Sequence, residues 1–248
     1  MKTTGNTILI TGGSAGIGFE IAKVFSENGN KVIITGRDEA RLAKAASQLK
    51  NATPIVSDIS DKNAIAALVN RVAADFPELN VVINNAGRAF YYKLDGDQDA
   101  ASIAEEEMLT NYLSVIRLNQ ALLPTLKNAP DAAIVNVSSI AAIAANHQLA
   151  TYAASKAALH SYSQSLRITL AGSSVKVFEL MPPLVNTEFS QEIGGANGIP
   201  PKEVADELFN AFETETFEVR VGNTESLYQL YLSSPGEALR AMNPDVKF

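Results

Sequence analysis

Short runs of β-branched and other apolar residues alternate with segments of helical periodicity along the whole chain. After the first run, residues 7–10, the apolar residues Ile17, Ile21, Val24 and Phe25 recur at helical spacing. Strands that alternate with helices form a parallel sheet, because each helical connection crosses back over one face of it. The pattern predicts an α/β fold: a single Rossmann-type doubly wound domain, with a parallel sheet of about seven strands and helices on both faces.

The remaining segments follow the same alternation. The expected strands cover residues 7–10, 31–35, 53–57, 81–84, 133–138, 175–180 and 217–221. The expected helices begin near residues 17, 39, 61, 103, 151, 202 and 224. The long helix over residues 103–126 is apolar almost all round, so we expect it to be buried or to lie at a subunit interface. No repeat, low-complexity stretch or linker interrupts the pattern, so residues 1–248 are expected to form one domain.

Composition excludes several classes of function. The chain has 248 residues, a formal net charge of −7 and no cysteine. An acidic chain is a poor general nucleic-acid binder, because phosphates need basic partners. Without cysteine, and with only His147 and His160, no metal site is expected. No apolar stretch is long enough for a secretory signal or a membrane span, so we expect a cytoplasmic protein.

A glycine-rich segment, TGGSAGIG at residues 11–18, stands between the first expected strand and its helix. Glycines let the backbone turn sharply and approach a pyrophosphate, and the helix start offers free N–H groups and the positive end of its dipole. The motif predicts a dinucleotide-binding loop, and a glycine-rich turn without a ligand is the alternative. The residues expected to contact the cofactor here are Gly12, Ser14, Gly16, Ile17 and Gly18.

The end of the second expected strand bears on the choice of nicotinamide cofactor. Folds that prefer NAD place a carboxylate there, which accepts hydrogen bonds from the ribose hydroxyls. This chain has Gly36 and then Arg37, and a guanidinium can bind a 2′-phosphate through planar, charge-assisted hydrogen bonds. NADP(H) is therefore favoured. NAD(H) remains the alternative, because Asp38 could pair with Arg37 or serve as the ribose acid itself.

Tyr152 and Lys156 are four residues apart in an expected helix, so their side chains share a face. Ser139 ends an expected strand, and Asn111 lies in the long helix. A carbonyl that accepts a hydride also needs a proton, and a tyrosine can supply it if a lysine ammonium and an oxidised nicotinamide lower its pKa from about 10. We expect Tyr152 to act as acid in reduction and base in oxidation, while Ser139 donates a hydrogen bond to the substrate oxygen. An amphipathic helix pair without a catalytic role is the alternative.

Together these motifs resemble the classical short-chain dehydrogenase/reductase family. The resemblance covers roughly residues 6–190 and includes the TGxxxGxG spacing and the NNAG sequence at residues 84–87. It implies a catalytic tetrad of Asn111, Ser139, Tyr152 and Lys156. In that family the lysine also holds the nicotinamide ribose, and the asparagine orders a water that relays protons. The resemblance implies further cofactor contacts from Asp58, Ile59, Asn85, Ala86, Gly87, Pro182, Val185 and Thr187.

The chain departs from the family pattern in two places. Pro183 stands where the family usually has glycine, which stiffens the turn beside the nicotinamide and removes a donor. The ending after about residue 190, together with the PPLVNTEF segment, is similar to a small bacterial subgroup named for an association with teichoic-acid D-alanylation. The altered ending weakens the inference to the family's usual tetramer, so a homodimer through the two long helices is expected and a tetramer is the alternative.

Three segments should reach the carboxyl ends of the strands, where doubly wound folds bind ligands: residues 88–93, 140–150 and 188–200. The last is rich in glycine and proline and predicts a mobile lid over the substrate. The aromatic run Phe90 to Tyr92 could line a ring-binding pocket or serve only for packing. His147, near the site by its position, is expected to be an ordinary loop histidine.

The predicted function is an NADP(H)-dependent carbonyl reductase or alcohol dehydrogenase that acts on a small-molecule carbonyl or alcohol. Its main alternative is a non-catalytic dinucleotide-binding sensor or scaffold protein. A second alternative is an epimerase or dehydratase that uses its cofactor transiently; the loop spacing and the short C-terminal region argue against it. No residue identifies the substrate.

Overall fold

All seven strands lie in one parallel sheet in the computed structural model, which describes residues 1–247. They pair in the order β3-β2-β1-β4-β5-β6-β7. The strands are β1 (Thr7–Thr11), β2 (Lys31–Gly36), β3 (Ala52–Val56), β4 (Val81–Asn84), β5 (Ala132–Val137), β6 (Val175–Met181) and β7 (Glu218–Arg220). The chain winds outward from β1 to β3, returns to β4 beside β1, and winds outward again to β7. This order confirms the predicted single Rossmann-type doubly wound domain.

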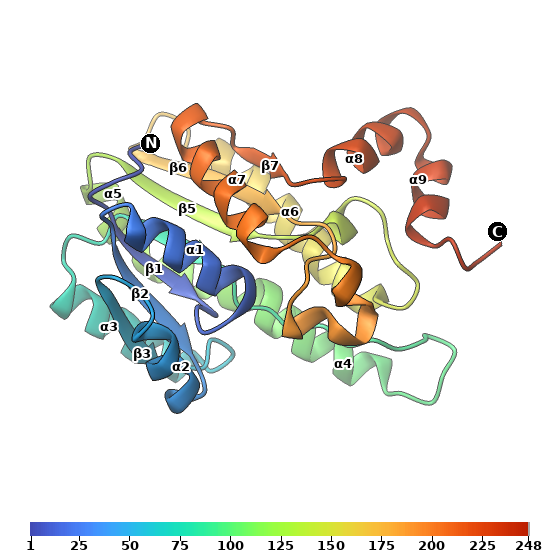
Figure 1. Ribbon diagram of the computed structural model, residues 1–248, viewed down its shortest axis with the longest axis horizontal. Helices are drawn as coiled ribbons and strands as arrows, with labels where there is room; N and C mark the ends of the chain where they lie inside the picture. Colours follow the sequence, from blue (N-terminus) through green and yellow to red (C-terminus); the bar gives the residue numbers. More distant parts are fainter. Residues whose placement is uncertain (248) are drawn as a thin grey trace.

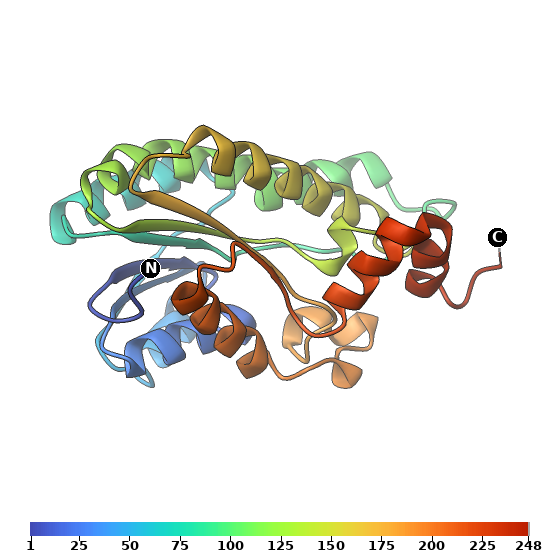
Figure 2. The same ribbon diagram turned by 90° about the horizontal axis from the view of Figure 1, so that it is seen from above.

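Helices cover both faces of the sheet (Figures 1 and 2). One layer consists of α1 (Gly16–Glu27), α2 (Glu39–Ala46) and α7 (Pro201–Thr214). The other consists of α3 (Lys62–Asp75), α4 (Ala100–Met108), α5 (Ser114–Asn128) and α6 (Ala150–Thr169). The last two helices, α8 (Thr224–Ser233) and α9 (Pro235–Met242), project from one end of the molecule (Figure 1). None of the helices within residues 1–247 has the length and apolarity that a membrane crossing requires.

The period of two along each strand decides which core its side chains enter. Ile8 and Ile10 of β1 pack with α1, α2 and α7, whereas Leu9 between them packs with α3 and α5. All three side chains are fully buried. A strand buried on both faces has to be apolar throughout, which explains why the strand sequences are continuous apolar runs.

Aspartates begin most of the helices in the first half of the chain. Asp38, Asp61 and Asp99 each accept a hydrogen bond from a backbone N–H in the first turn of α2, α3 and α4. Helix α1 is different: its N-cap is Ala15, which offers no side-chain hydrogen bond, and its first turn contains no acidic residue. The backbone N–H groups at the start of α1 are therefore left without a side-chain partner.

The long helix expected over residues 103–126 is not uniform. A π-helical turn at Leu109–Leu113 separates α4 from α5. In α4 only Glu107 is buried, and the neighbouring Glu105 and Glu106 are exposed. Helix α5, by contrast, buries one apolar face that includes Leu118 and Leu122. Of the two expectations for the long helix, burial does not hold for α4. A role at a subunit interface stays a prediction.

The C-terminal hairpin of α8 and α9 packs on the loop that precedes α6. The sequence predicted α8 but not α9. Leu227 and Ala238 form a small apolar cluster with Ala144 of that loop. Asn243 strengthens the contact: its Oδ1 accepts a hydrogen bond from the backbone N of His147 (2.8 Å), and its Nδ2 donates to the loop at 2.9 Å. The chain's end is thereby fixed to residues about one hundred positions earlier.

Candidate active site

A cleft of about 810 Å³ lies across the carboxyl ends of the strands, at the point between β1 and β4 where the strand order reverses. Its size is within the range of small-molecule sites. Every residue predicted for the site lines this cleft except Gly18 and Asn111. The lining residues among those predicted are Gly12, Ser14, Gly16, Ile17, Arg37, Asp58, Ile59, Asn85, Ala86, Gly87, Ser139, Tyr152, Lys156, Pro182, Val185 and Thr187.

The glycine loop is held by a side chain from the neighbouring strand. Asn85 Nδ2 donates to the carbonyl oxygen of Gly12 at 3.0 Å. Gly12 has φ +66° and Gly16 has φ +56°, left-handed conformations that favour glycine. A Cβ on Gly18 would lie 2.4 Å from both the Gly12 oxygen and Asn85 Nδ2. Gly18 therefore permits close packing beneath the loop and does not face the cleft.

The start of α1, which has no side-chain cap, is suited to bind an anion. Gly16 and Ile17, the first residues of the helix, line the cleft. Free N–H groups and the positive end of the helix dipole favour phosphate here, and no carboxylate in the first turn opposes it. The loop and helix start therefore fit the pyrophosphate of a dinucleotide.

The polar residues after β2 have different roles in the structure. Arg37 lines the cleft and is exposed. Asp38 Oδ1 accepts a hydrogen bond from the backbone N of Arg41 at 2.9 Å and so caps α2. A carboxylate occupied in this way is poorly placed to bind a ribose, which leaves Arg37 as the group at this end of the cleft.

Asp58, after β3, has a lowered pKa. Burial alone would raise its pKa, but hydrogen bonds from the Ser60 hydroxyl and backbone N–H, together with the charges of Arg37 and Arg88, lower that pKa below its usual value. Two of these bonds are short, at 2.7 Å and 2.9 Å. Asp58 is thus a fixed carboxylate in the cleft that feels the charges of two arginines.

Three side chains of the predicted tetrad meet at the other end of the cleft. Tyr152 and Lys156 lie on one face of α6, with the Lys156 Nζ 5.6 Å from the centre of the Tyr152 ring. Ser139 follows β5, and its hydroxyl is hydrogen-bonded to the Tyr152 side chain. Lys156 Nζ donates to the carbonyl oxygen of Val137 at 2.8 Å. The phenol, ammonium and hydroxyl groups are therefore brought together as the spacing predicted.

The electrostatic state of Tyr152 in the protein alone is set mainly by burial. Burial raises the pKa of Tyr152 to about 12; the hydrogen bond from Ser139 opposes this shift, and the negative charge of Glu107 adds to it. Burial lowers the pKa of Lys156 to about 8, opposed by the charge of Glu179. The expected lowering of the tyrosine pKa involves an oxidised nicotinamide beside the phenol, so it stays a prediction for the complex with cofactor.

Asn111 lies in the π-helical turn and is 1% exposed. Its Oδ1 accepts from the backbone N of Arg88 at 2.8 Å, and its Nδ2 donates to the Arg88 oxygen at 2.8 Å and to Ser155 Oγ at 2.9 Å. The amide thus joins the segment after β4 to α6. Both N–H groups of the amide are donated, while its oxygen keeps one acceptor site, so its proposed part in ordering a water stays a prediction.

The segment predicted as a lid, residues 188–200, contains two short 3₁₀ turns and covers the cleft. Glu188 forms an ion pair with Arg41 of α2 at 2.5 Å. The Phe189 ring lies 6.3 Å from the Tyr152 ring, centre to centre. Thr187, just before the segment, lies against Gly16 at the start of α1: a Cβ added to Gly16 would be 3.2 Å from Thr187 Cγ2. The segment thus contacts both ends of the cleft, while its mobility stays a prediction.

The segments after β4, β5 and β6 and the C-terminal hairpin line the cleft with apolar side chains and with polar ones that include Asn146, Gln148 and Asn223. Of the three consecutive aromatic residues after β4, only Tyr91 lines the cleft. Tyr92 is buried, with its hydroxyl 2.9 Å from Thr151 Oγ1, and Phe90 lies under the Arg88 guanidinium at 4.8 Å. The other apolar lining residues here are Ile140, Leu149, Pro183, Leu184, Phe189, Ile193, Ala241 and Met242.

Sequence reasoning missed two kinds of residue at this site. Ala241 and Met242 come from α9, which the sequence did not predict. Glu107 and Glu179 are fully buried and act on Tyr152 and Lys156 through their charge. An acidic residue inside an apolar strand was the available signal for Glu179, whereas Glu107 belongs to an acidic run and gave none.

Comparison with known proteins finds similarity to short-chain dehydrogenases and other oxidoreductases. A family profile described as short chain dehydrogenase matches residues 6–197. An oxidoreductase of Bacillus subtilis named DltE, whose function is uncharacterised, is 40% identical over 209 residues, which cover 84% of this chain and 83% of that protein.

Two solved structures share the fold. A short chain dehydrogenase of Burkholderia cenocepacia in complex with NADP has a TM-score of 0.86 and 27% identity, covering 97% of this chain and 98% of the other. A short chain dehydrogenase/reductase of Burkholderia phymatum in complex with NAD has a TM-score of 0.88 and 21% identity, covering 95% of each chain. A nicotinamide dinucleotide is thus a ligand of proteins built like this one.

Replacing Gly18 with alanine should destabilise the protein. The new Cβ would meet the Gly12 oxygen and Asn85 Nδ2 at 2.4 Å, and such overpacking costs about 1–3 kcal/mol of the free energy of unfolding. Urea unfolding followed by circular dichroism measures this loss. The matched control is Gly236→Ala in α9, where the new Cβ has only one neighbour, at 4.0 Å. Equal stability of the two variants would contradict the packing role of Gly18.

Proposed function

The chain belongs to the short-chain dehydrogenase/reductase family, and from this premise we propose an NADP(H)-dependent carbonyl reductase or alcohol dehydrogenase with Tyr152 as general acid and base. The family makes it an oxidoreductase that acts on CH–OH or C=O groups. One observation carries the finer proposal: Tyr152, Lys156 and Ser139 meet in the same cleft as the uncapped start of α1. A phosphate-binding helix start and a proton-donating group are what hydride transfer to a carbonyl requires.

The residues of this chain divide the work of proton transfer. A nicotinamide dinucleotide bound in the cleft supplies the hydride when reduced and a positive ring charge when oxidised. Tyr152, with a pKa of about 12 in the protein alone, keeps its proton at neutral pH and can donate it to the substrate oxygen. Lys156, with a pKa of about 8, is mostly protonated at neutral pH and stabilises the phenolate that forms. Ser139 donates a hydrogen bond to the same substrate oxygen, and in oxidation each proton moves in reverse.

A non-catalytic sensor or scaffold is the alternative of a different class. Such a protein needs the dinucleotide end of the cleft and gains nothing from a phenol, an ammonium and a hydroxyl held together at the other end. The juxtaposition of these three groups therefore favours the enzyme. A transient use of the cofactor, as in an epimerase or dehydratase, differs in that it consumes no NADPH overall.

NADP(H) is the proposed cofactor because Arg37 lines the cleft while Asp38 caps α2. The NADP complex of the Burkholderia cenocepacia relative supports this proposal. NAD(H) remains the alternative, since Arg41, which also lines this region of the cleft, is already in an ion pair with Glu188.

The proposed substrate is a small carbonyl compound or alcohol with an apolar substituent. Phe189 lies against the Tyr152 ring, and Leu149 and Met242 also line the cleft, so an apolar group would be favoured there. Gln148 and Asn223, which line the same cleft, can hydrogen-bond to a polar part of the substrate. Arg88, the cation nearest these residues in the chain, is already in an ion pair with Glu106 at 3.0 Å.

We further propose a homodimer formed through α5 and α6, with a tetramer as the alternative. Ile168 on α6 is 77% exposed and Leu113, at the start of α5, is 39% exposed. Exposed small residues, among them Ala154 and Ala157, follow the same helix and would let a partner helix approach closely.

Tyr152→Phe should abolish most of the reductase activity. Loss of a general acid lowers kcat about 10²–10⁴-fold, whereas NADPH binding should change much less. The measurement is the decrease in NADPH absorbance with a panel of aliphatic and aromatic aldehydes and ketones. Tyr162→Phe, on the same helix but bonded to Asn119 away from the cleft, is the matched control and should keep its rate. A Tyr152→Phe protein as fast as the wild type, or a wild type that turns substrate over without consuming NADPH, would contradict the mechanism.

Arg37→Ala should weaken NADPH binding about 10–100-fold, because a charged hydrogen bond contributes about 1.5–3 kcal/mol. NADH binding should be nearly unchanged, since NADH has no 2′-phosphate. Fluorescence titration with both nucleotides measures the two affinities. Arg71→Ala, which removes an exposed arginine of α3, is the control for net charge. A cofactor preference that survives Arg37→Ala would remove the reason for naming NADP.

Ile168→Glu should convert the dimer to a monomer, because a charge would be buried against the partner helix. Sedimentation velocity gives the mass of each form. Leu232→Glu on α8, at a residue 61% exposed but outside the proposed interface, should leave the dimer intact. A monomeric wild type, or an unchanged mass in Ile168→Glu, would refute this interface.

A further inference from the structure

Glu179 places a carboxyl group in the core, where the neighbouring side chains of its strand are apolar. It lies in β6 and is fully buried. Because side chains alternate along a strand, Glu179 shares the α6-facing side of β6 with Val177, while Phe178 and Leu180 enter the opposite core. A buried carboxylate is costly unless it is paired. We therefore expect Glu179 to be hydrogen-bonded to other polar groups, and its burial to serve a role in the protein.

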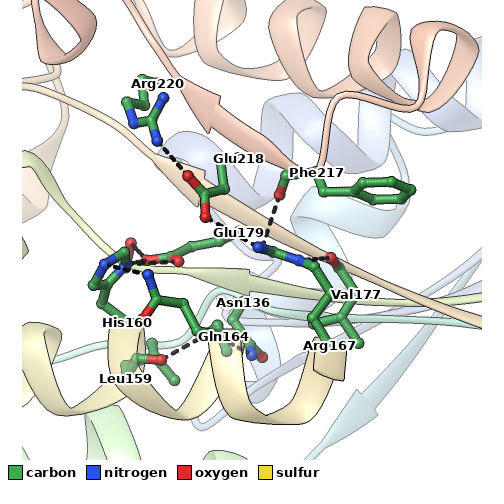
Figure 3. A network of polar contacts seen from close by, with 12 residues as sticks. Asn136, Leu159, His160, Gln164, Arg167, Val177, Glu179, Phe217, Glu218 and Arg220 are labelled. Atoms are coloured by element: carbon green, nitrogen blue, oxygen red, sulfur yellow. Dashed lines mark hydrogen bonds and ion pairs between the residues drawn. The ribbon is translucent and has the colours of Figure 1, made fainter. Parts of the chain in front are cut away.

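The partners of Glu179 come from β5 and α6. The Ser138 hydroxyl donates to Glu179 Oε1 at 2.5 Å. His160 Nδ1 lies 2.8 Å from Oε2 and 3.0 Å from Oε1 (Figure 3). Both carboxyl oxygens are thus bonded, one to a residue beside Ser139 and the other to a residue one helical turn after Lys156.

This network lies directly behind the catalytic groups. Ser138 immediately precedes Ser139, and its backbone N donates to the Leu180 oxygen at 2.8 Å, so β5 and β6 are joined both by backbone and by side chain here. Lys156 Nζ donates to the carbonyl oxygen of Val137, the residue before Ser138. Glu179 therefore contacts the short stretch of β5 that orients both Ser139 and Lys156.

The charge of Glu179 acts on both of the bases on α6. It opposes the burial that lowers the pKa of Lys156. The hydrogen bond with Glu179 is the largest cause that raises the pKa of His160, while burial lowers it. A carboxylate facing Lys156 and His160 on one helix favours the protonated form of each.

Other charged groups surround this pair. On β7, Glu218 raises the pKa of His160 and Arg220 lowers it. Glu218 also forms ion pairs with Arg220 and with Arg167 of α6, the latter at 3.0 Å (Figure 3). These partners largely neutralise Glu218. On the cleft side, Glu107 acts on Tyr152.

We infer that Glu179 and His160 form a buried carboxylate–imidazole pair that positions Ser139 through Ser138 and keeps Lys156 charged during proton transfer. The pair has a positioning role and does not touch the substrate. This inference rests on the proposed function only for what Lys156 does in the reaction; the pair itself is a property of the protein.

The direct test is the pH profile of Glu179→Gln. Glutamine preserves size and an acceptor for Ser138 but removes the negative charge. Lys156 should then lose its proton at lower pH, so the alkaline limb of kcat for carbonyl reduction should move to lower pH by about one unit, a tenfold rate loss on that limb. At a pH low enough to keep Lys156 protonated in both proteins, NADPH affinity should stay unchanged, since Glu179 does not line the cleft. An unshifted limb in the folded variant overturns the proposal.

Ser163→Ala is the matched control for loss of a buried polar contact. Ser163 lies on α6, and its hydroxyl accepts from Asn136 Nδ2 at 2.9 Å in the same layer between helix and sheet. This variant should lower the melting temperature without moving the pH limb. A limb that moves equally in Ser163→Ala would assign the effect to general loosening of α6 and overturn the charge role.

A second variant covers the case in which Glu179→Gln does not fold. Replacing both partners, Glu179→Leu with His160→Leu, leaves neither member of the pair unpaired, and such exchanges are commonly tolerated. The double variant also removes the charge that faces Lys156, so its alkaline limb should move in the same direction. An unshifted limb here likewise overturns the proposal.

A measurement independent of activity separates this inference from the proposed function. The chain has only two histidines, so the ring signals of His160 can be followed by NMR and assigned with His147→Gln. The pKa of His160 should be raised in the wild type and should fall in Glu179→Gln. A His160 pKa at the ordinary value in the wild type refutes the pair, whereas an inactive wild type with a raised His160 pKa refutes only the proposed reaction.

Discussion

Parallel strands all end at the same edge of their sheet, and the site depends on this constraint. The connections after β1, β2, β3, β4, β5 and β6 all emerge on one side, where they form the cleft. Because the order reverses between β1 and β4, the connections there diverge onto opposite faces and leave space for a ligand. The glycine loop, Arg37 and Ser139 are far apart in the chain but are each a strand's end, so hydrogen bonding between strands fixes their spacing.

Desolvation sets the chemistry at the inner end of the cleft. Burial raises the pKa of Tyr152 to about 12 and lowers that of Lys156 to about 8, and both shifts favour the uncharged form. The two buried glutamates act in different ways: Glu107 makes Tyr152 harder to ionise, and Glu179 keeps Lys156 easier to protonate. The protein alone therefore holds a protonated acid beside a cation, the arrangement that reduction of a carbonyl needs at its start.

The local signals in the sequence predicted most of the fold and the residues of the candidate site. The strand runs, the Asp61 cap and the glycine loop are each encoded within a few neighbouring residues, where steric and hydrogen-bonding preferences act directly. The prediction failed where distant residues decide the outcome. The helix expected over residues 103–126 is interrupted by a π-helical turn, and α4 before that turn buries only Glu107. Helix α9 was missed although Asn243 fixes the chain's end to the loop before α6.

The sequence by itself determined the order of strands and helices, the turn at Gly12 and Gly16, and the shared helix face of Tyr152 and Lys156, because these depend on backbone preferences and on the 3.6-residue period. Only the tertiary structure decided that the Asn111 amide hydrogen-bonds to Arg88 and Ser155, and that Glu179 hydrogen-bonds to Ser138, the residue before Ser139. The physical reason is that the pKa of a side chain and its free hydrogen-bonding groups depend on what surrounds it in space, and those surroundings come from segments tens of residues away.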